Sequence, residues 1–177
     1  GRVLGKKAGL AVMTLDILKV TLAVFLVSLF TRLTGQPLDG LSAELQAEIQ
    51  SQRQLVMIIA GFAAAMGHCF PLFARFKGGK AVATMYGFLF GMAVCTSYNI
   101  LIFILPLIFF LVVLYIWKII ALASMLSGVF ITVYAYFVVG SVEMAAALLV
   151  FTILMIVRHR KNIERMIKKE ENKISWM

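Results

Sequence analysis

The chain has 177 residues, of which 62% are hydrophobic and only 14% are charged, and its mean hydropathy is +0.98. A soluble domain of this size cannot bury so much apolar surface, so the composition excludes an ordinary soluble protein and predicts a membrane protein. The formal net charge of +9 would suggest a nucleic-acid partner in a soluble protein. In a membrane protein the sidedness of the loops explains most of this charge, and we expect no nucleic-acid partner.

Apolar residues occur in long blocks with short polar interruptions, and each block is close to the length of a membrane span. A spanning helix needs roughly 20 apolar residues, with about 17 as a lower limit. The blocks predict six spans, at residues 8–31, 54–70, 81–98, 99–117, 119–139 and 142–157. Because lipid offers the backbone no hydrogen-bond partners, we expect an all-α, polytopic transmembrane helix bundle. The sequence has no repeat or linker, so residues 1–177 are expected to form one integral-membrane domain.

The segment 32–53 is the one sizeable loop that this arrangement leaves on the external side. Ser42, followed by Glu44 and Leu45, could begin a short surface helix there. No residue in the segment indicates chemistry, and we expect it to be structural.

Basic residues divide unequally between the two sides when the six blocks are threaded alternately through a membrane. Fourteen of the 17 Lys and Arg residues fall on the side of the two termini and of segment 67–84. Arg32 and Arg53 fall on the opposite side, and Lys19 lies within the first block. Basic residues in short loops stay in the cytoplasm, so both ends of the chain are expected to be cytoplasmic.

The most informative polar segment is GHCFPLFARFKGGKAVAT, from Gly67 to Thr84. Gly78 and Gly79 lie between Lys77 and Lys80, so the backbone can approach an anion while the lysines supply charge. A helix beginning near Ala81 would direct its positive end to the same place. Spacing alone supports equally an ordinary glycine turn with lysines that anchor it at the membrane surface.

The second polar segment is RHRKNIERMIKKEENKI, from Arg158 to Ile174. Its seven basic residues would attract anionic lipid headgroups, and that general role is the simpler interpretation. His159 and Asn162 are three residues apart, so one helical face could present an imidazole and an amide together. Asn162 has no value as a lipid anchor, which favours a functional role for the pair.

Three further features could belong to a site, namely an intramembrane ion pair, the two cysteines and His68. Asp16 and Lys19 lie within the first apolar block, where charges are costly unless paired, and they could support a site or form a structural ion pair. Cys69 and Cys95 lie in apolar surroundings without metal-ligand spacing, so we expect them to be packing residues and expect no metal site. His68 considered alone is more often a structural residue at the membrane interface than a base.

GHCFPLFARFKGGKAVAT resembles the second signature, GHxFPxFxxFKGGKGVAT, of the bacterial integral-membrane acyltransferases that use acyl phosphate. GRVLGKKAGL with Asp16 and Lys19 is similar to the stretch after the first signature of that family, and HRKNIERM with ENKI resembles the third. The resemblance implies transfer of an acyl group from a fatty acyl phosphate to the 1-hydroxyl of glycerol 3-phosphate, without a cofactor. It also implies a protein in the bacterial inner membrane, in contact with membrane lipids, with cytoplasmic active-site loops.

The same resemblance implies a role for each matching residue. Substrate would be bound by Arg2, His68, Lys77, Gly78, Gly79 and Lys80. His159 and Asn162 would be the catalytic pair that orients the acyl phosphate and its carbonyl. Glu171 would be a structural acid, and Asp16 and Lys19 would support the site.

The sequence departs from the family pattern at several places. The first signature, GSGNxGATN, would lie just before Gly1, so the six spans would be the second to seventh of seven. We therefore expect these 177 residues to have little or no turnover on their own. Ala81 and Lys169 stand where the family has glycine, and Ala121 stands where a serine is usual.

Two other classes of function remain open at this stage. A small transporter of a phosphorylated or anionic solute would suit six spans and an intramembrane Asp16 and Lys19 pair. A non-catalytic scaffold would use the glycines for packing and the basic tail for lipid. The nearly uniform apolar character of residues 101–116 and 142–157 argues against transport.

Overall fold

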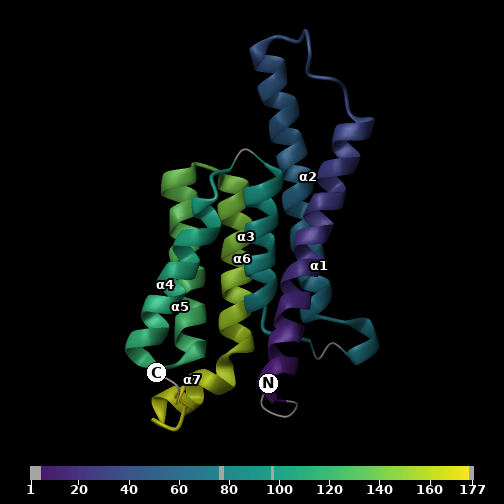
Figure 1. Cartoon of the computed structure of the whole chain (residues 1–177). Helices are drawn as coiled ribbons and strands as arrows, with labels where there is room; N and C mark the ends of the chain where they lie inside the picture. Colours follow the sequence, from purple (N-terminus) through teal and green to yellow (C-terminus); the bar gives the residue numbers. More distant parts are fainter. Residues whose placement is uncertain (1–4, 76–77, 97, 176–177) are drawn as a thin grey trace.

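The computed structural model describes residues 5–75, 78–96 and 98–175, apart from the side chains of residues 6 and 74. The described residues form helices and connecting segments without a β-strand, which confirms the all-α class (Figure 1). The main helices are α1 (Gly5–Thr34), α2 (Ala43–Cys69), α3 (Val82–Cys95), α4 (Leu101–Trp117), α5 (Ile120–Tyr134), α6 (Val142–Arg158) and α7 (Arg160–Ile167). A 3-10 turn, η1 (Leu72–Ala74), follows α2, and a π-helical turn, η2 (Ala135–Val139), extends α5.

Each of the six predicted spans coincides with a helix, but the helices differ in length. Among the described residues, only Lys7–Thr34 and Ile120–Val139 are individually long and apolar enough to cross a membrane. Helices α6 and α7 satisfy the same criterion together, as a pair bent by 58°. Helix α3, with 14 residues, is only about 21 Å long, shorter than a hydrocarbon core of about 30 Å. The prediction was therefore right about where the helices lie. Of the described helices, two alone, or three with the bent pair, have the length and hydropathy of a membrane span.

The prediction of a long external loop at 32–53 was wrong. Helix α1 continues to Thr34, and α2 begins at Ala43, where the Ser42 hydroxyl accepts a hydrogen bond from the Leu45 amide at 3.4 Å. The N-cap was therefore anticipated, but the helix that it starts is 27 residues long rather than a short surface element. Residues 43–53 are mostly strong helix formers, so the polar half of α2 continues into the apolar half without a break.

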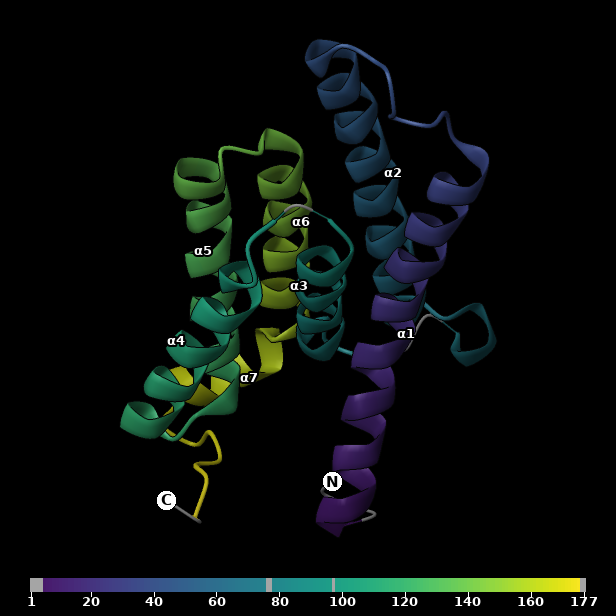
Figure 2. The ribbon, with the colours of Figure 1, turned by 45° about the horizontal axis from the view of Figure 1, so that its top comes forward.

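The helices pack in a bundle in which α1 lies against α2 and α3, α4 lies against α5, and α5 lies against α6 (Figure 2). Contact between α1 and α3 is close at Gly87, where a Cβ atom would collide with the backbone of Ile17. The Thr21 hydroxyl donates to the Gly87 carbonyl at 3.0 Å across this contact. Small residues and interhelical hydrogen bonds of this kind hold helices together in lipid.

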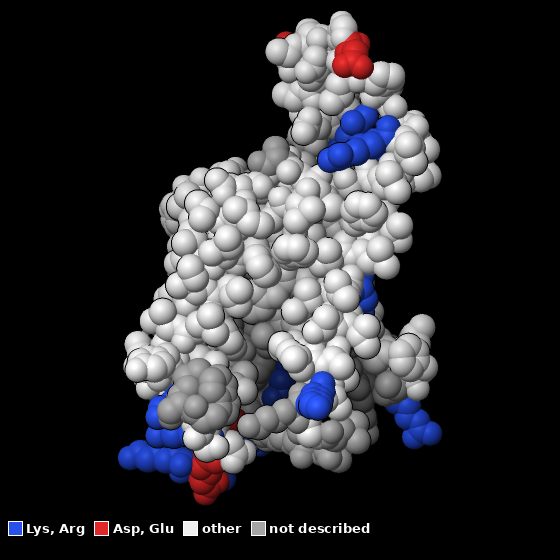
Figure 3. All heavy atoms as spheres, viewed as in Figure 1, with Lys and Arg blue, Asp and Glu red and all other residues white. Residues whose placement is uncertain are grey.

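The segments that carry the predicted site meet at one end of the bundle, at the bottom of Figure 1. The connection from α2 to α3, the turn from α4 to α5 and the bend from α6 to α7 all lie there, close to both ends of the chain. Lys and Arg side chains gather at this end, and a second basic group lies near the turn from α1 to α2 (Figure 3).

Candidate functional site

The bend between α6 and α7 positions the two residues predicted to be catalytic. Helix α6 ends at Arg158, and His159 takes φ −94° and ψ 6° before α7 starts in a new direction, 58° away. The expected single helical face for His159 and Asn162 is therefore wrong, because the helix is broken at the first of the two residues. Both side chains are nevertheless buried, with 3% of His159 and 6% of Asn162 exposed, and both line one cavity.

Asn162 is the centre of a chain of charged and polar contacts. Lys80 Nζ donates to Asn162 Oδ1 at 2.6 Å, and Asn162 Nδ2 donates to Glu171 Oε1 at 2.7 Å. The other oxygen of Glu171 accepts from Arg165 Nε at 2.6 Å. An ammonium group only donates and a carboxylate only accepts, so these partners fix the orientation of the Asn162 amide. The predicted structural acid thus positions the predicted catalytic amide.

His159 is held in one tautomer by its own helix. Its Nδ1 lies 2.8 Å from the Met155 carbonyl oxygen, which can only accept, so Nδ1 carries the proton. Burial lowers the pKa of His159 below its usual value, and the nearby charge of Lys80 lowers it further, against opposing contributions from the Met155 carbonyl and Glu171. The imidazole is therefore neutral near pH 7, and its Nε2 is the atom that can accept a proton or hydrogen bond.

The segment that immediately precedes α3 is called here the glycine loop. It consists of Gly78, Gly79, Lys80 and Ala81. A Cβ atom on Gly78 would collide with the carbonyl oxygen of His68, and one on Gly79 would collide with the His68 imidazole. The Gly79 amide donates to the His68 carbonyl at 3.3 Å. A side chain at position 78 would displace the loop backbone, and one at position 79 would displace the loop or the His68 imidazole, so both glycines permit close approach.

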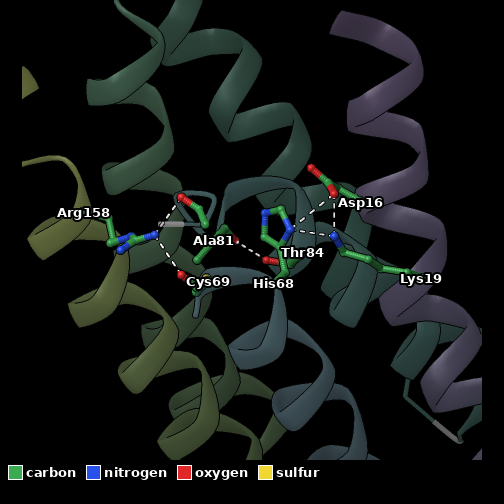
Figure 4. Close-up of polar contacts among 8 residues, drawn as sticks. Asp16, Lys19, His68, Cys69, Ala81, Thr84 and Arg158 are labelled. Atoms are coloured by element: carbon green, nitrogen blue, oxygen red, sulfur yellow. Dashed lines mark hydrogen bonds and ion pairs between the residues drawn. The ribbon is translucent and has the colours of Figure 1, made fainter. Parts of the chain in front are cut away.

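His68 belongs to a polar cluster with Asp16 and Lys19 of α1 (Figure 4). Lys19 Nζ donates to Asp16 Oδ1 at 2.5 Å and lies 2.6 Å from His68 Nδ1. Because the ammonium group can only donate, His68 Nδ1 accepts and the proton is on Nε2. Nε2 is also the atom that a Cβ added at Gly79 would approach most closely. The ion pair predicted within α1 therefore exists, and it orients the imidazole that borders the glycine loop.

A cavity of about 970 Å³, which we call the apolar cavity, extends from this polar end into the bundle. Its apolar walls come from α1, α3, α4 and α5, and include Met13, Ile17, Phe103, Leu107, Phe110 and Leu111. Its polar end is formed by Asp16, His68, Lys80, His159, Asn162 and Glu171. The volume is within the usual range for a small-molecule site, about 300 to 1,000 Å³.

A second hollow of about 530 Å³, which we call the cationic pocket, adjoins the apolar cavity. It is lined by five basic residues, Lys80, Arg158, Arg160, Lys161 and Arg165, and by the apolar side chains of Phe70, Leu154 and Val157. Lys80 and Asn162 line both hollows. An anion in the cationic pocket and an apolar chain in the apolar cavity can therefore both reach Lys80 and Asn162.

Eight of the eleven predicted site residues line the two hollows, and Lys19, Arg2 and Lys77 are the other three. Asp16 also lines the apolar cavity, whereas Lys19 acts through Asp16 and His68. Arg2 and Lys77 lie outside the described residues. Arg158 was predicted only as a member of the basic tail, yet its guanidinium lies against the glycine loop. No sequence signal could have identified that role, because its partners there are backbone carbonyls.

Comparison with known proteins gives a consistent result. The family model for glycerol-3-phosphate acyltransferase matches residues 1–169. The chain is 39% identical over 176 residues to the glycerol-3-phosphate acyltransferase of Bacillus subtilis (strain 168), covering 99% of this chain and 77% of that one. It is also 39% identical over 176 residues to the glycerol-3-phosphate acyltransferase of Staphylococcus haemolyticus (strain JCSC1435), covering 99% and 78% of the two chains.

A solved structure has the same arrangement of helices. The crystal structure of PlsY (YgiH), an integral membrane glycerol 3-phosphate acyltransferase in its lysophosphatidic acid form, matches with a TM-score of 0.75 and 26% identity. The match covers 98% of this chain and 76% of that chain. The chain therefore belongs to the glycerol-3-phosphate acyltransferase family of integral membrane proteins.

Proposed function

We propose that the chain transfers a fatty acyl group from acyl phosphate to the 1-hydroxyl of glycerol 3-phosphate. The products are lysophosphatidic acid and inorganic phosphate, in the first step of phospholipid synthesis. The observation that carries this proposal is the Lys80 and Asn162 pair, which lines both the apolar cavity and the cationic pocket. An acyl transfer to a phosphorylated alcohol needs such a junction, because one reactant is mainly apolar and the other is a small anion.

Each hollow suits one reactant. The fatty chain of the donor would occupy the apolar cavity, with its acyl phosphate group at the polar end near His159. The phosphate of glycerol 3-phosphate would lie in the cationic pocket beside Lys80 and Gly78. Arg2 and Lys77 remain predicted substrate-binding residues.

The chemistry is one displacement at the acyl carbon. The 1-hydroxyl oxygen attacks the carbonyl, a new ester bond forms, and the bond between the acyl carbon and the phosphate oxygen breaks. Asn162 and Lys80 hold the reacting groups close together, which converts a bimolecular step into one with a high effective concentration. The neutral His159 Nε2 is placed to accept a hydrogen bond from the attacking hydroxyl, whose proton leaves with the phosphate or passes to solvent.

A comparison of acyl donors tests this proposal. The purified chain in proteoliposomes would be given labelled glycerol 3-phosphate with either palmitoyl phosphate or palmitoyl-CoA, beside the Bacillus subtilis relative as a positive control. We expect lysophosphatidic acid and an equal amount of inorganic phosphate from palmitoyl phosphate, and no product from palmitoyl-CoA. This expectation replaces that of little or no turnover made from the sequence, because the Lys80 and Asn162 pair and both hollows are formed by these residues. Equal rates with both donors would reject acyl phosphate as the specific donor. No product from either donor, with the control active, would reject the acyltransferase assignment.

We also propose that the chain lies in the bacterial inner membrane with the glycine loop and α7 facing the cytoplasm. The excess of basic residues at that end supports this orientation (Figure 3). The two native cysteines are buried, so a single exposed cysteine can report sidedness. Lys173→Cys should react with a membrane-impermeant maleimide only in inside-out vesicles. Reaction in right-side-out vesicles would reverse the orientation.

A further inference from the structure

We propose that Arg158 is a positioning residue that holds the glycine loop in the conformation that receives phosphate. This inference rests on the proposed function, because the benefit of a fixed loop is measured as affinity for glycerol 3-phosphate. It differs from a direct phosphate contact, since Arg158 directs its hydrogen bonds to the protein backbone.

Arg158 makes its described hydrogen bonds to three carbonyl oxygens, and Figure 4 shows the one to Cys69. Its Nε donates to the Gly79 carbonyl at 3.0 Å, and its Nη2 donates to the Gly78 carbonyl at 2.7 Å and to the Cys69 carbonyl at 2.8 Å. Its guanidinium also lies over the Phe70 ring, 5.4 Å from the centroid. One side chain at the end of α6 therefore joins the last residue of α2 to both glycines of the loop.

These contacts determine the direction of the loop amides. In a trans peptide the carbonyl and the following N–H point in opposite directions, and the described residues contain no cis peptide bond. The Gly78 carbonyl faces Arg158, and the Gly79 amide of the same peptide points away, to the His68 carbonyl at 3.3 Å. The Gly79 carbonyl also faces Arg158, so the Lys80 amide of the next peptide points away from Arg158.

Only arginine has the geometry for this task. A guanidinium carries five N–H groups in a rigid plane and can reach three separate acceptors, whereas a lysine ammonium is a single compact donor at the end of a flexible chain. Glycines at 78 and 79 permit close approach, but they also make the loop flexible when nothing holds it. Arg158 supplies the constraint that the glycines lack.

The location of Arg158 links the loop to the catalytic pair. Arg158 immediately precedes His159, the residue at which the chain bends into α7. Arg158 therefore contacts the glycine loop and lies next to the bend. The Lys80 and Asn162 contact spans the same two segments. Arg158 is thus placed to set the relative position of the loop and α7 before substrate binds.

Two measurements on Arg158→Lys test this inference, with Lys168→Ala as the control because Lys168 is exposed at the C-cap of α7. The first is hydrogen exchange of the peptide 68–81 without substrate, which needs no enzymatic activity. We expect about tenfold faster exchange in Arg158→Lys, because local opening of the loop becomes easier. The second is steady-state kinetics, in which we expect the KM for glycerol 3-phosphate to rise about tenfold while kcat changes by less than about threefold.

The outcomes separate this inference from its alternatives. Unchanged exchange in Arg158→Lys would overturn it, and so would faster exchange with an unchanged KM. A loss of kcat with constant KM would indicate a merely structural role, and would also overturn it. If the unsubstituted chain has no turnover, the proposed function fails, while the exchange measurement still decides whether Arg158 holds the loop.

Discussion

Lys80 and Asn162 lie 82 residues apart in the chain and are joined by a hydrogen bond of 2.6 Å from Nζ to Oδ1. The contact connects the glycine loop before α3 to the first turn of α7, and it borders both the apolar cavity and the cationic pocket. The two polar segments singled out in the sequence therefore form one site.

Replacing Lys80 by alanine should weaken binding of glycerol 3-phosphate. The substitution removes a positive charge from the cationic pocket, and a charge-assisted hydrogen bond contributes about 1.5 to 3 kcal/mol, or roughly tenfold to a hundredfold in affinity. We expect the KM for glycerol 3-phosphate to rise by that factor in initial-rate measurements. Lys168→Ala should behave as the unsubstituted chain, and an unchanged KM in Lys80→Ala would place the phosphate elsewhere.

Glu171 should be important for stability, because only 4% of its side chain is exposed and it accepts from both Asn162 and Arg165. Glu171→Ala leaves the buried Asn162 amide without its acceptor, while the partly exposed Arg165 can be hydrated, and should lower the free energy of unfolding by about 1 to 3 kcal/mol. The melting temperature in detergent measures this change. The melting temperature of Glu171→Gln should lie between those of Glu171→Ala and the unsubstituted chain, because glutamine keeps an acceptor oxygen.

The control for this prediction is Glu170→Ala, which removes an exposed acid from the neighbouring position. If Glu170→Ala and Glu171→Ala lowered the melting temperature equally, the effect would come from general charge rather than from the contacts of Glu171.

The sequence was most informative where the chemistry depends on residue type. Lys80, Asn162 and Glu171 are polar residues beside apolar helices. Spacing indicates Lys80 and Asn162 as candidates, and the family resemblance indicates all three. Arg158 was not identified, because its partners are the carbonyls of Cys69, Gly78 and Gly79, and every residue type has a carbonyl. The apolar cavity was also unpredictable, since its walls come from four helices whose packing order cannot be read from hydropathy.

Hydropathy located the helices well and their ends less well. Helix α2 begins at Ala43 because polar helix formers continue the apolar segment, and a search for apolar blocks cannot detect that extension. The bend at His159 was missed for a related reason, since residues on both sides of it favour helix.

The protonation of His159 should make stability depend on pH. Burial lowers its pKa in the folded protein, so between that lowered value and about 6.5 the unfolded chain binds the proton more readily. The free energy of unfolding should therefore decrease as pH falls through this range. Melting temperatures at pH 7.5 and 5.5 should differ more for the unsubstituted chain than for His159→Asn, whose amide can still donate to Met155. Identical pH dependence in the two proteins would contradict a buried neutral imidazole.

Lys169→Gly should stabilise the protein. Lys169 has φ +60°, a left-handed conformation that costs a non-glycine residue about 1 kcal/mol, and its side chain is exposed. The resemblance places glycine at this position in the family, which agrees with the observed backbone. We expect a rise in melting temperature of about 2 to 4 °C. Lys168→Gly is the matched control, because Lys168 has φ −78° and glycine should destabilise there; an equal effect at both positions would refute the backbone argument.

Ala81 has the same conformational cost but a different expected outcome, because it has φ +67° and is only 1% exposed. Ala81→Gly relieves about 1 kcal/mol of backbone strain and loses about 0.8 kcal/mol of methyl burial, so its melting temperature should be almost unchanged. Ala81→Val should be strongly destabilised, since a β-branched residue rarely adopts positive φ. Tolerance of valine, measured as an unchanged melting temperature, would show that the loop adopts another backbone conformation.

The most direct test of the central claim, that the Lys80 and Asn162 junction performs acyl transfer, is the initial rate of lysophosphatidic acid formation by Asn162→Ala. The assay uses palmitoyl phosphate and labelled glycerol 3-phosphate in proteoliposomes, with the unsubstituted chain beside it. We predict equal amounts of lysophosphatidic acid and phosphate from the unsubstituted chain, and less than about 1% of that rate from Asn162→Ala, as expected when a group that positions the reactants is lost. An unchanged rate in Asn162→Ala would contradict the claim, as would movement of glycerol 3-phosphate across the membrane without acyl donor and without product.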